Sequence, residues 1–205
     1  MPFSLGKLFK NTSSPKPIII VSGLPRSGTS MMMKMLESAG LEILTDNLRS
    51  ADESNPKGYY EFERVKQLKV GDFDWLPEAR GKVVKIISAL LEYLPSQYQY
   101  RIIFMRRNMD EILSSQRQML VRDGKPVDDV ADTKLADLYE SHLKKIEAWL
   151  EAQPNMSTLY VSYNQILKDP EPDVTRLIQF LGGTLDRDRM LKTVDPNLYR
   201  ERRSG

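Results

Sequence analysis

The stretch IIIVSGLPRSGTSMMMKML, residues 18–36, decides the fold of this chain. A continuous β-branched run closed by Gly23 is typical of a strand that is buried on both faces of a parallel sheet. The residues that follow predict a tight turn and then a helix over 28–39, which ends at Gly40. The order strand, glycine turn, helix is the layout of a phosphate-binding loop.

The spacing inside the turn supports an anion site. Gly23 and Gly28 allow the backbone to turn sharply and to approach an anion closely. The free N–H groups and the dipole at a helix start attract negative charge. Arg26 adds a permanent cation, and hydroxyl groups come from three further residues, Ser27, Thr29 and Ser30. The alternative is a plain strand-to-helix turn, which would gain nothing from an arginine between its glycines.

Thr29 stands where loops that use nucleoside triphosphates place a lysine after the second glycine. That lysine reaches the β- and γ-phosphates, and an acidic residue helps to hold Mg²⁺. No strand-ending aspartate stands out as a metal holder. We therefore expect the loop to bind a phosphate group without transferring it, and we expect no metal.

Further strands and helices are predicted to alternate along the chain. We expect strands over residues 17–23, 82–87, 100–105 and 157–163, and helices over 28–39, 59–69, 108–124, 127–153 and 172–183. Residues 41–58 are polar and rich in turn residues, which favours a loop. The alternation predicts an α/β fold with three layers, α/β/α, around a central, mainly parallel sheet like that of P-loop nucleotide hydrolases. Ligands of such sheets bind at the carboxyl ends of the strands.

A second basic site follows the strand at 100–105. Arg106 and Arg107 end this strand, and Ser115 lies eight residues after Arg107. With Asn108 as the helix N-cap, the preceding loop would have to fold back for Arg107 and Ser115 to reach one anion. The alternative is a pair of surface arginines and a solvated serine. Two anion sites on one sheet edge would suit a ligand with phosphates at both its 5′ and 3′ positions.

The composition excludes several classes of protein. A net charge of +2 over 205 residues gives no support for nucleic acid as a partner. The chain has no cysteine and a single histidine, so disulfides and multi-histidine metal sites are excluded. We expect a cytoplasmic protein without a membrane span, with a flexible lead-in at residues 1–15 and one domain over 16–205.

Three segments in order resemble the sulfotransferases that use 3′-phosphoadenosine 5′-phosphosulfate (PAPS). GLPRSGTS resembles their 5′-phosphosulfate loop, in the Pro-Arg-Ser-Gly-Thr form of tyrosylprotein, carbohydrate and many bacterial members. MRRNMDEILSSQ resembles the motif in which an arginine and a serine, here Arg107 and Ser115, hold the 3′-phosphate. YVSYNQILKDPEPDVTRLIQFLG resembles the late segment whose tyrosine, here Tyr163, lies near the adenine. NPKGYYEFE and VDPNLYR also resemble pieces of small bacterial members.

The resemblance implies a P-loop-like α/β domain and a metal-independent, in-line transfer of a sulfuryl group from PAPS to an acceptor hydroxyl or amine. The product is adenosine 3′,5′-bisphosphate (PAP). Arg26 would stabilise the charge that develops on the bridging oxygen, because a fixed cation there favours the transition state. Lys85 resembles a lysine that contacts the sulfuryl group, although Ile86 and Ile87 replace the Asp-Pro that follows it in related enzymes.

The acceptor also needs a general base. Small-molecule members use a mid-chain histidine, but His142 lies later, and we read it as structural or solvent-facing. Glu61 is the preferred base, with salt bridging as its alternative role. The other candidate carboxylates are Asp46, Asp52, Glu53 and Glu63, and the role of four C-terminal arginines stays open: Arg189, Arg200, Arg202 and Arg203.

Two rival functions remain at this stage. One is a P-loop kinase or nucleotide hydrolase with a degenerate loop, and the other is a non-catalytic nucleotide-binding protein. The sequence does not identify the acceptor, which we expect to be a small molecule or a carbohydrate. A homo-oligomer is possible, because a short chain could need a partner copy to complete the acceptor site.

Overall fold

The computed structural model describes residues 15–46, 60–124 and 129–194. Residues 1–14 of the predicted lead-in, the carboxylates Asp52 and Glu53, and the arginines at 200, 202 and 203 lie outside these ranges. Within them, no helix is long and apolar enough to cross a lipid bilayer.

The described strands form one parallel sheet in the order β2-β3-β1-β4-β5. Their bounds are β1 Ile18–Gly23, β2 Ile43–Leu44, β3 Val83–Lys85, β4 Tyr100–Arg106 and β5 Met156–Ser162. β1 pairs with β3 on one side and with β4 on the other. The buried, β-branched β1 is therefore central, as its sequence predicted.

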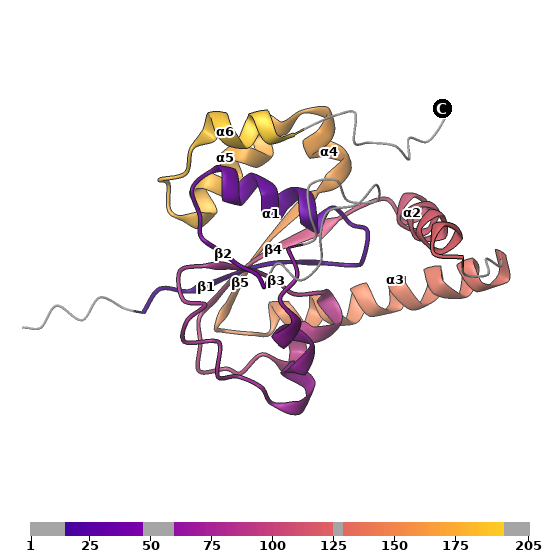
Figure 1. The fold of residues 1–205 in the computed structure, drawn as a ribbon, viewed down its shortest axis with the longest axis horizontal. Coiled ribbons are helices and arrows are strands. Elements are labelled where there is room, and N and C mark those ends of the chain that lie inside the picture. The colour runs from indigo at the N-terminus through magenta and orange to yellow at the C-terminus, as the bar shows by residue number, and fades with distance from the viewer. Residues whose placement is uncertain (1–14, 47–59, 125–128, 195–205) are drawn as a thin grey trace, which may run out of the picture.

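Helices cover both faces of the sheet (Figure 1). On one face, α1 Thr29–Ser38, α5 Pro170–Leu181 and α6 Arg187–Thr193 share a core with alternate residues of β1 and β4. On the other face, α3 Asp129–Glu151 packs with two 3₁₀ helices, η1 Glu63–Val70 and η2 Ser88–Tyr93. Two further helices, α2 Met109–Arg122 and α4 Tyr163–Lys168, follow β4 and β5 directly. This is the predicted three-layer α/β/α fold.

Several local predictions needed correction. The helix expected over 59–69 is a 3₁₀ helix that begins at Glu63. The loop expected over 41–58 contains the short edge strand β2. Tyr163 begins α4 and does not end the strand. The sequence missed η2 and α6. These elements are too short to show a clear hydrophobic period.

The residues that were predicted to cap or end helices were confirmed in that role. Asn108 caps α2, because its side chain accepts a hydrogen bond from the backbone N–H of Asp110 at 2.9 Å. Gly40 follows α1 with φ +94°. At the end of α5, Gly182 has φ +106°.

Candidate functional site

The loop between β1 and α1 forms a tight cradle at the carboxyl edge of the sheet. Gly28 is the N-cap of α1, with φ 97° and ψ 14°, and the first turn of the helix contains no acidic side chain. The first intrahelical bond runs from the N–H of Met32 to the carbonyl of Gly28 at 3.2 Å. The N–H groups of the preceding turn have no acceptor inside the helix, so this end attracts an anion.

Both glycines of the loop occupy positions that no other residue could take without a clash. A Cβ at Gly23 would lie 2.5 Å from the Ser27 hydroxyl oxygen and 2.6 Å from the Met105 carbonyl. A Cβ at Gly28 would lie 2.3 Å from the Tyr163 ring. The loop therefore packs directly against the end of β4 and the start of α4.

Ser27 is buried at 1% exposure, and its hydroxyl has no hydrogen-bond partner among the described residues. A buried hydroxyl without a partner is costly, so its position calls for a reason. The hydroxyl fills the space beside Gly23, inside the turn of the loop. It is a donor available to a group bound in the cradle.

Arg26 links the loop to α2. Its backbone has φ 69°, a left-handed conformation that is uncommon for a residue with a side chain. Its Nε donates to the hydroxyl oxygen of Ser115 at 3.0 Å. Ser115 is buried on α2. The left-handed backbone at Arg26 thus accompanies a side chain that points towards α2, the helix that follows β4.

Arg107 contacts the same loop from β4. Its Nη1 donates to the backbone carbonyl of Arg26 at 3.0 Å, and its guanidinium lies 4.6 Å from the centre of the Tyr163 ring. The side chain is only 7% exposed. The expectation that the loop before α2 folds back so that Arg107 and Ser115 reach one anion stays a prediction, and Arg26 is the arginine that donates to Ser115. The sequence-predicted residues Arg26, Arg107, Ser115 and Tyr163 do lie together.

Lys85 and Glu61 lie on the opposite side of β1 from this cluster. Lys85 ends β3 in register with Val21, on the sheet face that α1 covers, because side chains alternate along a strand. The Glu61 carbonyl accepts hydrogen bonds from the Thr45 hydroxyl at 2.7 Å and from the Asp46 N–H at 3.2 Å. Glu61 therefore lies where β2 ends. β2 is two strands from β1, or about 10 Å across the sheet.

Two other candidate bases have structural contacts. Asp46 accepts a hydrogen bond from the Glu63 N–H at 2.6 Å, so its carboxylate caps η1. Glu63 pairs with Lys66 at 2.7 Å on the surface.

His142 is half-buried, and its Nε2 lies 2.8 Å from the Ser88 hydroxyl at the start of η2. Burial lowers the pKa of this imidazole, a shift to which the charge of Lys145 adds and which that of Glu92 opposes. Of the two expected roles, structural or solvent-facing, the contact with Ser88 favours the structural one. The pair joins α3 to the segment that follows β3.

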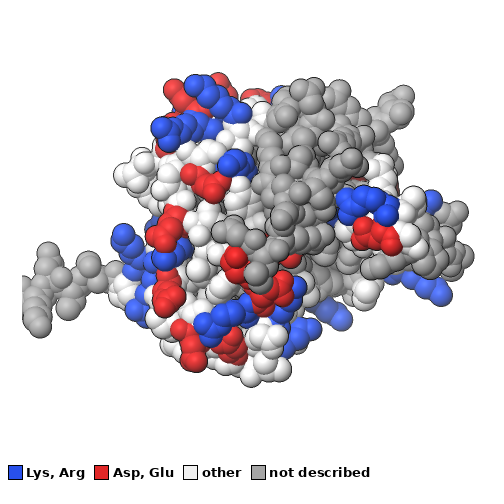
Figure 2. Space-filling model, in the orientation of Figure 1, with Lys and Arg blue, Asp and Glu red and all other residues white. Residues whose placement is uncertain are grey.

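Arg189 is exposed on α6, where its Nε pairs with Asp186 at 3.2 Å. Charged side chains of both signs are interspersed on the uncovered part of the face in Figure 2. This distribution gives no support for nucleic acid as a partner.

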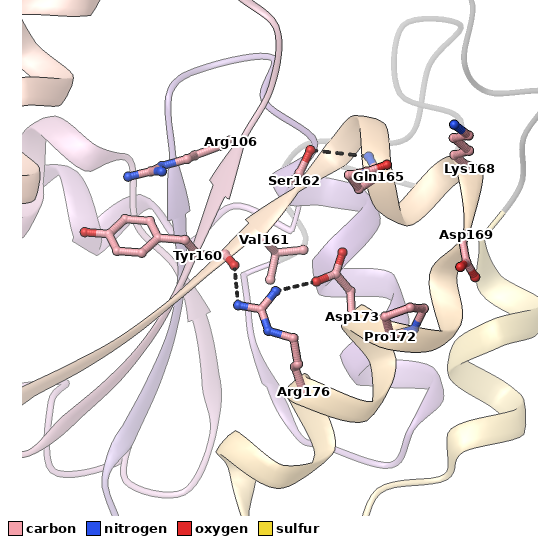
Figure 3. Close-up of a pocket in the computed structure, with 10 residues that line it drawn as sticks. All are labelled: Arg106, Tyr160, Val161, Ser162, Gln165, Lys168, Asp169, Pro172, Asp173 and Arg176. Atoms are coloured by element: carbon pink, nitrogen blue, oxygen red, sulfur yellow. Dashed lines mark hydrogen bonds and ion pairs between the residues drawn. The ribbon is translucent and has the colours of Figure 1, made fainter.

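A cleft of about 550 Å³ lies beside β5 (Figure 3). Arg106 lies over the Tyr160 ring at 4.1 Å and pairs with Glu147 at 2.7 Å. Arg176 donates to the Tyr160 carbonyl at 3.1 Å and pairs with Asp173 at 2.7 Å. Arg106 belongs to the second basic site that the sequence predicted, but the residues predicted to bind the donor or to act in catalysis are not among those that line this cleft. Both arginines already have partners.

Fold and site together define a P-loop-like α/β domain in which Arg107 and Arg26 join the β1–α1 loop to the segment that follows β4. The sulfotransferase domain family model matches residues 16–203, and the chain belongs to the sulfotransferase family. Membership implies transfer of a sulfuryl group. A search of curated protein sequences finds no match.

Solved sulfotransferase structures share this fold. The sulfotransferase STF1 from Mycobacterium tuberculosis has a TM-score of 0.54 at 18% identity, over 88% of this chain and 71% of that one. A sulfotransferase from Alicyclobacillus acidocaldarius has a TM-score of 0.52 at 15% identity, over 89% of this chain and 88% of that one. The sulfotransferase domain from the curacin biosynthetic pathway has a TM-score of 0.53 at 14% identity, over 89% and 79%.

Proposed function

We propose that this protein transfers a sulfuryl group from PAPS to an acceptor hydroxyl or amine, in line and without a metal. One observation carries the proposal: Arg107, from the end of β4, donates to the carbonyl of Arg26 in the loop after β1. Cations from two strand ends thus meet beside a helix N-terminus. A nucleotide with anionic groups at its 5′ and 3′ positions suits this arrangement.

The loop would hold the 5′ end of the donor. Gly23 and Gly28 leave the space that a backbone close to an anion requires, and the buried Ser27 hydroxyl lacks a partner inside it. Thr29 and Ser30 begin α1, where their N–H groups and hydroxyls would add donors. The residues present therefore fit a 5′-phosphosulfate group.

Arg107 and Ser115 would hold the 3′-phosphate, and Tyr163 would lie against the adenine. Ser115 already accepts a hydrogen bond from Arg26 Nε, and its hydroxyl proton remains available for donation to an anion. The hydroxyl could therefore contact the 3′-phosphate and Arg26 at the same time. Binding of the 3′-phosphate would then help to position Arg26 for the 5′ end of the nucleotide.

The order of the strands indicates in which direction the donor would lie across the edge of the sheet. The 3′-phosphate and adenine residues follow β4 and β5, on one side of β1. Lys85 ends β3, and Glu61 lies beside the end of β2, on the other side. The donor, when bound, supplies an activated sulfuryl group, and we place its sulfuryl end towards β3.

Arg26 of the loop and the two residues on that side then have defined roles. Arg26 stabilises the negative charge that develops on the leaving phosphate, and it acts as a fixed cation because arginine does not readily give up a proton. Lys85 binds the sulfuryl oxygens. Glu61 accepts the proton of the acceptor hydroxyl as the new bond to sulfur forms. We propose a small molecule or a carbohydrate as the acceptor. We also propose a cytoplasmic location, and a homo-oligomer in which a second copy of the chain completes the acceptor site.

The two rival functions differ in their requirements. A kinase or hydrolase needs the loop lysine, which Thr29 replaces here, and the family match speaks against this reading. A non-catalytic nucleotide-binding protein would bind PAP and transfer nothing.

The experiment is transfer of labelled sulfate from PAPS to a panel of phenols, aliphatic alcohols, amines and sugars, in EDTA. The proposal predicts metal-independent transfer to at least one acceptor class and its loss in Arg26→Ala. Binding of PAP without transfer across the panel would favour the non-catalytic reading. Turnover of ATP that depends on Mg²⁺ would favour the hydrolase.

A further inference from the structure

Glu111 is a buried carboxylate beside the predicted 3′-phosphate residues, and the sequence analysis gave it no role. It lies on the first turn of α2, and its side chain is 6% exposed. Its Oε2 accepts a hydrogen bond from Arg107 Nε at 3.0 Å. Its Oε1 accepts one from Asn164 Nδ2 at 2.9 Å. Both carboxylate oxygens are therefore engaged.

Asn164 extends these contacts to the strand end. Its Oδ1 accepts a hydrogen bond from the backbone N–H of Asn108 at 3.1 Å. Its own position follows Tyr163, whose ring lies against Gly28 of the loop. Glu111 and Asn164 thus join the end of β4, the first turn of α2 and the start of α4. A buried charge is tolerated only when it is paired and hydrogen-bonded, and here it is both.

The geometry of Arg107 follows from these contacts. Glu111 holds Nε, the Arg26 carbonyl holds Nη1, and the Tyr163 ring lies under the guanidinium plane. A planar guanidinium fixed at three places can turn neither in its plane nor out of it. Its remaining N–H donors therefore have a set direction before any ligand arrives, and a fixed donor binds an anion with less loss of entropy.

We propose that Glu111, supported by Asn164, is a positioning residue that holds Arg107 for the 3′-phosphate and so sets the preference for a nucleotide with a 3′-phosphate over one without it. This inference rests on the proposed function. Glu111 touches no substrate in this account and acts through Arg107 alone.

The test compares the binding of PAP with that of 5′-AMP by calorimetry, because the two ligands differ by the 3′-phosphate. In Glu111→Gln the amide has only one oxygen, so Arg107 Nε and Asn164 Nδ2 cannot both keep an acceptor. We expect PAP affinity to fall about tenfold, as for the loss of one hydrogen bond to a charged group. The affinity for 5′-AMP stays unchanged.

If only the charge of Glu111 mattered, the change in PAP affinity would have the opposite sign. If Glu111 merely neutralised Arg107, its removal would strengthen the attraction for the 3′-phosphate, and PAP would bind more tightly to Glu111→Gln. If Glu111 only stabilised the fold, both ligands would weaken together. Either result overturns the proposal.

Two further variants complete the design. Asn164→Ala leaves the charge of Glu111 in place and is expected to lower PAP affinity in the same selective way, which keeps the proposal testable if Glu111→Gln does not fold. Asp110→Asn is the matched control, because it removes an exposed carboxylate one residue away on α2. It should leave the ratio of the two affinities unchanged.

The wild-type protein separates this inference from the proposed function. If it shows no preference for PAP over 5′-AMP, the proposed donor is wrong. If it prefers PAP and both Glu111→Gln and Asn164→Ala keep that preference, the donor stands and the positioning role fails.

Discussion

Substitution of Gly28 by alanine tests the packing of the loop against α4. Gly28 has φ +97°, and the new Cβ would lie 2.3 Å from the Tyr163 ring. A left-handed backbone costs a residue with a side chain about 1–2 kcal/mol. The ring must also move away from the Arg107 guanidinium, 4.6 Å from its centre, which would cost roughly 1–2 kcal/mol for a desolvated contact.

Gly40 offers a matched control at the other end of α1. Its φ is +94°, almost that of Gly28, but a Cβ there would meet nothing within 4 Å. Gly40→Ala therefore carries the backbone cost alone, about 1–2 kcal/mol. The difference between the two variants isolates the collision with Tyr163.

The assay is thermal unfolding followed by PAP titration. We expect Gly28→Ala to lose about 3 kcal/mol of stability, a fall in Tm of about 6–12 °C, and Gly40→Ala to lose roughly half as much. PAP affinity should fall at least about tenfold in the first variant, a change worth about 1.4 kcal/mol, and stay unchanged in the second. Equal stability and equal PAP affinity in the two variants would refute the packing of Tyr163 against the loop.

Three further predictions concern other parts of the molecule. Arg26→Ala should lower the transfer rate by about 10²–10³ with a smaller effect on PAP affinity, measured by steady-state transfer and calorimetry, and an unchanged rate would exclude Arg26 from the reaction. Burial lowers the pKa of His142 from 6.5 in the folded protein, so protonation favours the unfolded chain. The free energy of unfolding, measured in urea titrations, should therefore fall as pH drops below about 6.5. This pH dependence should be absent in His142→Asn. Asn108→Ala should cost about 1 kcal/mol in the same urea titration at pH 7.5, because it removes the cap on the N–H of Asp110; no loss would show that the cap is not stabilising.

The sequence predicted the parts of the fold that local pattern controls. The apolar run at 18–23 and the glycine turn placed β1 and α1 correctly, because a buried strand and a helix start each have a recognisable local signature. Asn108 marked the start of α2 and Gly182 the end of α5 for the same reason, whereas α5 begins at Pro170, two residues before its expected start. Edge strand β2, with two residues, has no such signature.

The predicted site was incomplete where contacts join distant parts of the chain. Arg26 and Ser115 are 89 residues apart, and no local pattern shows that one donates to the other. Ser88 and His142 are 54 residues apart, and Glu111 and Asn164 are 53 apart. Spacing from Arg107 did not indicate Glu111, because Arg107 precedes the N-cap Asn108 and the rule that residues four apart meet applies within a helix. The burial of the pair depends on tertiary packing.

The central claim is that two arginines at neighbouring strand ends hold one adenosine nucleotide by its 5′ and 3′ groups. Calorimetric titration of the wild-type protein with PAP and with ATP, each in EDTA and again with Mg²⁺, tests it most directly. The account predicts that PAP binds the more tightly and that Arg107→Ala removes most of this preference. Equal or tighter binding of ATP, or a requirement for Mg²⁺ in either titration, would contradict it.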